Sequence, residues 1–354
     1  MSSAPPPKTS AGRFFEDFRV GEIFVHATPR TLTHGDVALY AALFGARFAV
    51  QSADSFAQAI GYPRSPIDDL LVFHTVFGKT VADISLNAIA NLGYADCWFL
   101  KAVWPGDTLS ATSEVIGLKE NSNRQSGIVT VRSRGFNQRG ETILDYVRWV
   151  MVRKRSADAP APSPVAPDLL SVVPPSALGV ACPPIDAARY DLALGGSPHR
   201  WGDYRTGEKI DHVDGVTVEE AEHQTATRLF QNNAKVHFNQ FSEGQGRFGR
   251  RLIYGGHVIS LARALSFNGL ANAFHLTAIN GGRHVAPLFA GDTVFAWSEV
   301  LDCAALPQRG DVGALRLRTV ATKNRPCADF PLRNGEGYEE NVILDFDYWV
   351  LAPR

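Results

Sequence analysis

The sequence predicts an α+β protein in which two copies of one unit follow each other along the chain. Segments of the first half recur in the same order in the second half, and each copy reads as an apolar helix followed by alternating strands. One long helix followed by a run of strands is typical of an antiparallel sheet wrapped on a helix. The length of 354 residues fits two units of about 150 to 180 residues, each large enough to bury a core.

Three ordered matches identify the duplication. The first two pairs are separated by 186 and 185 residues and the third by 200, which predicts an insertion in the second copy near residues 324–340. Proline, glycine and charged residues gather there, as in a loop. The matching segments are residues 15–22 with 201–208, 106–115 with 291–300, and 143–150 with 343–350.

A proline-rich segment separates the two copies. Residues 156–184 hold eight of the 21 prolines, and such a segment is expected to be extended and semi-rigid. Two linked copies are expected to pack as a pseudo-symmetric pair, with copy-to-copy contact in place of a dimer interface. The predicted parts are a flexible N-terminus, an N-terminal unit, a linker and a C-terminal unit, at residues 1–12, 13–155, 156–185 and 186–354.

Local patterns predict the elements of each unit. Thr217 and Glu220 form a capping-box pattern at the start of a helix that ends near residue 229, and residues 32–44 are its counterpart. A second helix is expected from about residue 256 to 267, where Asn268 and Gly269 follow. Alternation typical of half-buried antiparallel strands marks residues 127–134, 142–152, 314–322 and 342–351.

The composition argues against several classes of protein. Thirty-five Lys and Arg against 36 Asp and Glu leave a net charge of −1, which gives no global attraction to nucleic acid or to an anionic membrane. No apolar run approaches the ~18 to 20 residues of a membrane span, and no secretory signal is visible. The four cysteines lack the spacing of zinc ligands or a disulfide framework, so we expect no metal and a reducing cytoplasm.

The most informative stretch is residues 229–237, followed about 16 residues later by residues 253–257. This pair of motifs resembles the MaoC-like, or hydratase-2, enzymes of the hot dog fold. The resemblance implies a tandem (double) hot dog fold, each half a long central helix wrapped by an antiparallel sheet. The family histidine falls on His237, the central-helix glycine on Gly256, and the family aspartate on Asn232. In the first copy these polar positions are Ala46 and Gln51, so that copy is expected to be the non-catalytic half.

Hydration of an α,β-unsaturated thioester explains these residue types. A histidine with a pKa near 6.5 suits the proton transfers, and we assign them to His237. Backbone N–H groups of Gly255 and Gly256, at a helix start, suit the negative charge that develops on the thioester oxygen. Asn232 cannot exchange a proton near neutral pH, so it is expected to orient the water. Glu243 is a second candidate acid.

Three further stretches, together with residues 231–237 described above, resemble the mesaconyl-CoA hydratase family, in which the aspartate position is likewise an amide. This resemblance implies reversible dehydration of (2R,3S)-β-methylmalyl-CoA to mesaconyl-CoA and water in the ethylmalonyl-CoA pathway, without a cofactor. The stretches are residues 79–94, 231–237, 246–251 and 266–273.

Mesaconyl-CoA carries a free carboxylate beside its double bond, and an Arg fork is its natural partner. Arg247, Arg250 and Arg251 precede the helix-start glycines and are candidates for this carboxylate or for CoA phosphates; Tyr254 and His257 complete the binding set. The expected partner is a small acyl-CoA, with no nucleic acid or membrane and with a possible homodimer of the double unit.

Several other polar residues are expected to have structural roles and no part in catalysis. His74 and His223 are expected to be structural, the Asp68-Asp69 pair to cap a helix, and Arg148 to be a surface charge near a strand end. Two other functions stay open. A hot dog thioesterase would need a carboxylate such as Glu243 to activate water at the carbonyl, and a non-catalytic acyl-CoA binding module would bind without turnover.

Overall fold

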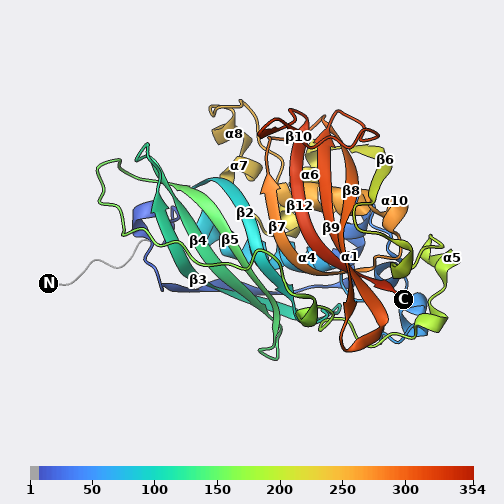
Figure 1. The fold of residues 1–354 in the computed structure, drawn as a ribbon. Helices are drawn as coiled ribbons and strands as arrows, with labels where there is room; N and C mark the ends of the chain where they lie inside the picture. The colour runs from blue at the N-terminus through green and yellow to red at the C-terminus, as the bar shows by residue number, and fades with distance from the viewer. Residues whose placement is uncertain (1–7) are drawn as a thin grey trace.

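Ten of the strands form one continuous antiparallel sheet in the computed structural model, which describes residues 8–354 (Figure 1). The predicted flexible N-terminus falls mainly on residues 1–7, which lie outside the described residues. The strand order is β1-β3-β4-β5-β2-β7-β12-β9-β8-β6. The first five strands belong to the first copy and the last five to the second copy. The sheet therefore consists of two five-stranded halves that meet edge to edge at β2 and β7.

Corresponding elements of the two copies occupy mirrored places in this order. In the first copy they are β1 (Ile23–Thr31), α1 (His34–Phe44), α4 (Asp69–Thr80), β2 (Ala88–Phe99), β3 (Thr108–Glu120), β4 (Ser126–Phe136) and β5 (Thr142–Arg153). In the second copy they are β6 (Lys209–Thr217), α6 (Glu220–Leu229), α9 (Gly255–Leu265), β7 (His275–His284), β8 (Thr293–Leu306), β9 (Arg309–Lys323) and β12 (Val342–Pro353). This arrangement confirms the predicted α+β class and the pseudo-symmetric pairing of the copies.

Shorter elements fill the connections. They are α2 (Ala49–Ser52), α3 (Asp54–Ala59), α5 (Leu192–Gly195), α7 (Lys235–Phe238), α8 (Gln240–Glu243), α10 (Phe267–Leu270) and the hairpin β10–β11 (Arg333–Asn334, Gly337–Tyr338). The hairpin lies in the predicted insertion between β9 and β12. None of the helices within residues 8–354 has the length and hydropathy needed to cross a membrane.

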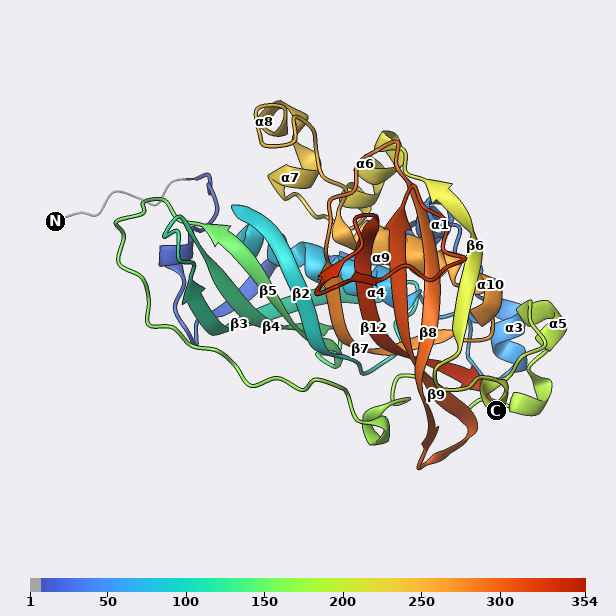
Figure 2. The same ribbon diagram turned by 45° about the horizontal axis from the view of Figure 1, so that its top comes forward.

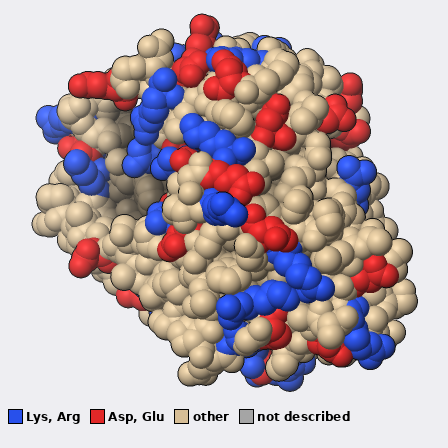
Figure 3. All heavy atoms as spheres, turned by 45° about the vertical axis from the view of Figure 1, so that its right-hand side comes forward, with Lys and Arg blue, Asp and Glu red and all other residues tan. Residues whose placement is uncertain are grey.

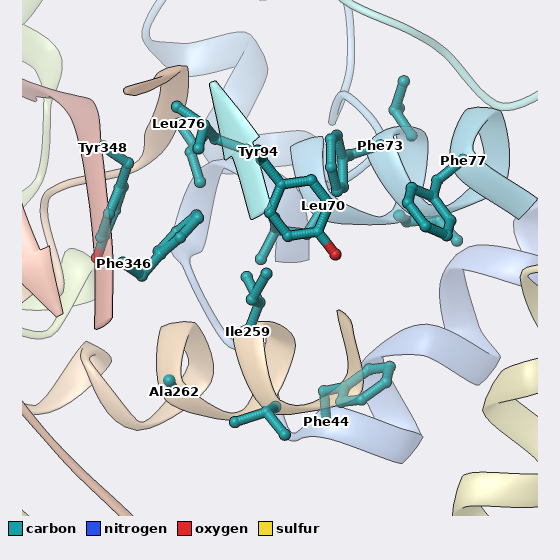
Figure 4. Packing of buried hydrophobic residues seen from close by; sticks show 14 of the residues in the cluster. Phe44, Leu70, Phe73, Phe77, Tyr94, Ile259, Ala262, Leu276, Phe346 and Tyr348 are labelled. Carbon is teal, nitrogen blue, oxygen red and sulfur yellow. The ribbon is translucent and has the colours of Figure 1, made fainter. Parts of the chain in front are cut away.

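The central helices α4 and α9 lie against the concave side of the sheet and share one core (Figure 2). Every residue of α4 after Asp69 is buried. Figure 4 shows side chains from α4, α9, β2 and β12 meeting between the two copies. The packing is close enough that a Cβ on Gly78 would lie 1.7 Å from the carbonyl oxygen of Phe230, so only glycine fits there. The copies are thus joined by a continuous core as well as by the sheet.

The segment between the copies runs along the outer face of the sheet (Figure 1). The carbonyl of Val173 accepts a hydrogen bond from the Trp349 indole at 3.1 Å, and Arg309 donates to the carbonyls of Cys182 and Pro183. These contacts cover a second apolar cluster that includes Val173, Trp349 and Leu351. The connection is therefore held against the sheet by hydrogen bonds at several points.

One predicted helix start was wrong. Thr217 is the last residue of β6 and does not cap a helix, because α6 begins at Glu220 after Glu219, whose side chain makes no capping hydrogen bond. The equivalent helix of the first copy does have a capping box, formed by Thr33 and Asp36. A capping box therefore begins this helix in the first copy, whereas the start of α6 in the second copy has no side-chain cap.

Candidate active site

A cavity of about 330 Å³ lies where the two copies meet. Residues of the first copy that line it come from the end of α4, from the following turn and from β2 and β5. Residues of the second copy come from the loop after α6, from the start of α9 and from the end of β7. The motif residues Asn232, His237, Tyr254 and Gly255 all line this one cavity. The structure therefore brings the predicted motifs together.

His237 lies on α7, a single turn between α6 and α8 (Figure 2), and lines the cavity. Its Nδ1 is 2.9 Å from the carbonyl oxygen of Leu252. A carbonyl only accepts, so Nδ1 must carry the proton and Nε2 keeps its lone pair. Burial lowers the pKa of His237 to about 4, whereas the Leu252 carbonyl acts in the opposite direction. At neutral pH the imidazole is therefore uncharged, with one nitrogen free to accept a proton.

Asn232 is buried at the sharp exit from α6, where the preceding Gln231 has a φ of 55°. Its side-chain Oδ1 accepts a hydrogen bond from the Ala234 N–H at 3.2 Å. The backbone N–H of Asn232 donates to the carbonyl of Thr227. The Ala234 N–H needs an acceptor and the side-chain NH2 of Asn232 is only a donor, so this contact fixes the orientation of the side-chain amide. The Nδ2 group is left for the cavity. Asn232 therefore offers a hydrogen-bond donor and not a base.

The start of α9 supplies backbone N–H groups at the cavity wall. Residues in the first turn of a helix have no intrahelical acceptor, and Gly255 lines the cavity. A Cβ on Gly255 would lie 2.4 Å from Nε2 of His284, and a Cβ on Gly256 would lie 2.5 Å from Cε1 of His74. Both glycines are thus required by close packing. Gly256, which does not line the cavity, permits the contact between α4 and α9.

Tyr254, just before these glycines, is fixed by two histidines. Its N–H donates to Nε2 of His223 at 2.9 Å, and its hydroxyl is 3.4 Å from Nδ1 of His74. The Nε2 of His74 is in turn 3.0 Å from the Ser260 hydroxyl. The structural reading of His74 and His223 agrees with these contacts.

His284 was not identified from the sequence. It ends β7, lines the cavity, and its buried Nε2 has no hydrogen-bond partner in the described residues. Burial, and then the nearby His237, lower the pKa of His284 to about 4. The register of β7 shifts twice against β12, so alternation along the strand does not reveal which side chains face inward. No simple sequence signal therefore pointed to this residue.

Arg148 was wrongly predicted to be a surface charge. It has no exposed area, lines the cavity, and its guanidinium lies over the ring of Phe77 at 4.2 Å. Its Nη2 donates to the hydroxyls of Thr80 and Ser85 at 2.8 and 3.3 Å. A signal was present in the sequence, because strand alternation puts Arg148 on the same face as the apolar residues two positions away on either side.

Three of the predicted binding residues point elsewhere. Arg251 donates to Glu220 at 2.6 Å, and Arg250 lies over the ring of Phe289 at 3.9 Å. His257 is buried in the core against Phe44 and does not line the cavity. Of the arginine triplet only Arg247, which is exposed, borders the cavity. A salt bridge and a cation–π contact thus withdraw the other two arginines from the expected carboxylate site.

Glu243 also lies away from the cavity. It ends α8, where its carboxylate accepts a hydrogen bond from the Ser242 hydroxyl, and it is absent from the cavity lining. The short helix α8 carries it outward beyond α7 (Figure 2). The prediction of Glu243 as a second acid at the reacting atoms is therefore wrong for this geometry.

The first copy lacks the motif at the related place. Gln51, the counterpart of His237, donates to the carbonyl of Phe274 at 2.7 Å and so has a structural contact. A second cavity, of about 580 Å³, is lined by Phe44, Gly45 and Arg47 from the first copy and by the end of α9. The position of Asn232 is Ala46 in the first copy, so the amide is absent from that copy.

The surface around these elements has no dominant sign of charge. Figure 3 shows basic and acidic side chains intermixed over one face. The described residues contain no group of three or more His, Cys, Asp and Glu side chains that could hold a metal ion, and all four cysteines are free.

Comparisons with known proteins agree with this architecture. A family model described as Mesaconyl-CoA hydratase matches residues 7–165. The chain is 63% identical to a β-methylmalyl-CoA dehydratase of Chloroflexus aurantiacus, over 98% of this chain and 99% of the relative. It is 62% identical to a mesaconyl-CoA hydratase of Cereibacter sphaeroides, over 98% of this chain and 100% of the relative.

Solved structures support the fold in the same way. A MaoC domain protein dehydratase from Chloroflexus aurantiacus superposes with a TM-score of 0.96 at 62% identity, covering 99% of both chains. Rv0216 of Mycobacterium tuberculosis, described as having a double hotdog fold, gives a TM-score of 0.72 at 25% identity over 96% of this chain and 98% of that one. The predicted tandem hot dog fold is therefore confirmed.

Proposed function

The chain belongs to the mesaconyl-CoA hydratase family of hydro-lyases, and from this premise we propose that it interconverts mesaconyl-CoA and water with (2R,3S)-β-methylmalyl-CoA, without a cofactor. The observation that carries the proposal is identity above 60% along nearly the whole chain to enzymes with these names. The cavity between the copies, with Asn232, His237 and Gly255 in its wall, supports the proposal chemically.

The hydration is assigned to His237 as the single acid and base. Its free Nε2 takes a proton from water while the water oxygen bonds to C3 of the enoyl thioester. Electron density moves to the thioester oxygen, where the Gly255 N–H at the start of α9 donates a hydrogen bond and the helix dipole adds to it. The imidazolium then returns the proton to C2. One water is added across the double bond, and the enzyme ends in its starting state.

Asn232 positions the water in this proposal. Its oxygen is held by the Ala234 N–H, so its Nδ2 group can donate to the oxygen of the attacking water or of the product hydroxyl. A neutral amide does not compete with His237 for the proton. This division of labour explains how a site with an amide at the family's carboxylate position can still transfer protons.

Burial suggests the direction in which the substrate lies. Arg247 is exposed at the cavity edge, where a CoA phosphate can meet it, and Arg148 on the inner wall has no exposed area. The acyl group therefore enters with its thioester near the start of α9 and its far end toward the first copy. The proposal needs no residue from a second chain.

The test is to mix purified protein with mesaconyl-CoA and to follow the enoyl-thioester absorbance, with mass analysis of the products. Loss of absorbance with gain of one water and an intact thioester is expected. Release of free CoA without a hydrated thioester would instead indicate a thioesterase. Binding without any turnover would indicate a non-catalytic acyl-CoA binding module, and either result would overturn the proposed reaction.

A further inference from the structure

Arg148 is a buried positive charge without a negative partner. Within the described residues 8–354 no carboxylate forms an ion pair with it, and burial lowers its pKa. Its contacts are the hydroxyls of Thr80 and Ser85 and the face of the Phe77 ring. A buried cation without an anion is costly, and removing one partner from a buried pair is strongly destabilising. The arrangement therefore needs an anion that the chain itself does not supply.

The unpartnered polar atoms around Arg148 gather at the same cavity. Nε and Nη1 of Arg148, the hydroxyl of Tyr94 and both amide atoms of Asn91 are buried without a hydrogen-bond partner. All three residues line the cavity and come from the first copy. Buried polar groups are nearly always satisfied, so a cluster of exceptions on one wall indicates a polar ligand.

The fold itself does not require this cation. Tyr348 occupies the position of Arg148 in the second copy, and its hydroxyl is 2.9 Å from the hydroxyl of Thr319. The same inward-facing strand position is thus satisfied there by a neutral pair. Arg148 belongs to the one cavity that holds the His237 motif.

We propose that Arg148, together with Tyr94, receives the free carboxylate at the far end of the acyl group and selects dicarboxylic acyl-CoA thioesters over monocarboxylic ones. This inference rests on the proposed function and locates its substrate specificity. Nη2 is held by two hydroxyls, so a single N–H donor of the guanidinium, on Nε or on Nη1, is left to donate to a given carboxylate, and the Tyr94 hydroxyl adds a second donor. The first copy, which lacks the catalytic motif, supplies the specificity site.

The test compares two saturated thioesters of equal chain length that cannot be hydrated. Succinyl-CoA carries the distal carboxylate and butyryl-CoA ends in a methyl group. Isothermal titration of the wild-type protein is expected to give about 10- to 100-fold tighter binding of succinyl-CoA, the range of a charge-assisted hydrogen-bonded pair. Arg148→Met is expected to abolish this preference. Arg153→Met, an exposed arginine at the end of the same strand, is the matched control and is expected to keep it.

Two further measurements separate binding from folding. Removal of an unpaired buried charge is expected to leave the melting temperature of Arg148→Met at or above the wild-type value. Tyr94→Phe removes only a hydroxyl that has no partner, so it should fold normally and lower the preference about 3- to 10-fold. If Arg148→Met keeps the preference, or loses both ligands equally together with its thermal stability, the carboxylate assignment is wrong.

The binding preference for succinyl-CoA over butyryl-CoA can be measured whether or not the protein hydrates mesaconyl-CoA. Wild-type turnover of mesaconyl-CoA tests the proposed function alone. A wild-type protein that hydrates mesaconyl-CoA, with an Arg148→Met variant whose kcat/KM for it is unchanged, would refute the specificity site and leave the reaction standing. A wild-type protein that prefers succinyl-CoA but hydrates nothing would refute the reaction and leave the carboxylate site standing.

Discussion

Replacing His237 by asparagine should separate the base from the fold. The Asn Nδ2 group can take the place of the histidine Nδ1 and keep the donation to the Leu252 carbonyl, which is 2.9 Å from Nδ1 in the structure. The substitution removes only Nε2 and the remainder of the ring. Because the retained contact positions the α7 turn, His237→Asn is expected to fold with little loss of stability.

The expected loss of rate follows from the role of the lost nitrogen. General acid–base catalysis contributes about 10²- to 10⁴-fold, which corresponds to about 3 to 5.5 kcal/mol of transition-state stabilisation. The loss should appear in kcat, with KM changed by less than about threefold, since the group acts on the water and not on substrate binding. His237→Ala should lose the same rate and also about 1 to 3 kcal/mol of stability, because it leaves the Leu252 carbonyl without its donor.

The assay is steady-state hydration of mesaconyl-CoA at pH 7.5, with thermal unfolding of each variant. The exposed His34 at the start of α1 provides the control, and His34→Asn is expected to keep the wild-type rate. A His237→Asn enzyme within about threefold of the wild-type kcat would refute the assignment of His237 as the base. His284, which is also buried and unpartnered at the cavity, would then be the next candidate.

Three further predictions follow from the same contacts. Asn232→Ala is expected to lower kcat at least about tenfold, or ~1.4 kcal/mol, while Asn232→Asp keeps part of the activity; equal rates for Asn232→Ala and wild type would exclude a role for the amide. Gly256→Ala should cost about 1 to 3 kcal/mol in denaturant unfolding because its Cβ meets the His74 ring, whereas Gly310→Ala, with open space around it, should be nearly neutral. Stability should fall as the pH drops from 6.5 toward 4, and a constant melting temperature over that window would contradict the burial of neutral imidazoles. The reason is that folding lowers the pKa of six histidines, so only the unfolded chain binds their protons there, at up to about 1.4 kcal/mol per pH unit each; they are His74, His212, His223, His237, His257 and His284.

The fold could be predicted because duplication and alternation are properties of the sequence itself. Strand ends agreed to within a few residues for β4, β5 and β12, since long runs rich in β-branched and aromatic residues mark all three strands. Asn268 and Gly269 were expected to follow the central helix, and the structure has them within α10, just after the end of α9 at Leu265, where Gly269 has a φ of 104°. The helix start at Thr217 was misplaced because a capping pattern does not show whether the preceding strand continues.

Only those residues of the candidate site that belong to a local sequence motif could be predicted from the sequence. Asn232, His237 and Gly255 come from contiguous stretches of the second copy, and the fold places them at one cavity. Arg148 and His284 reach the same cavity from strands far away in the sequence, so their approach depends on the register of the sheet. Arg148 was expected at the surface because of its charge, but it alternates with Tyr146 and Val150 on the inner face of β5 and is buried with them.

The fused chain explains why the two copies can differ at this site. In a symmetric homodimer, the Arg148 of each subunit would face the motif of the other subunit. A substitution would then change both sites in the same way. Here the position of Arg148 is Tyr348 in the second copy, and the position of Asn232 is Ala46 in the first. One cavity can therefore hold both His237 and Arg148, whereas the corresponding positions of the other copy are Gln51 and Tyr348. It follows that an acyl-CoA with a distal carboxylate should bind once per chain, and a titration that gives two equivalent sites would be incompatible with this division between the copies.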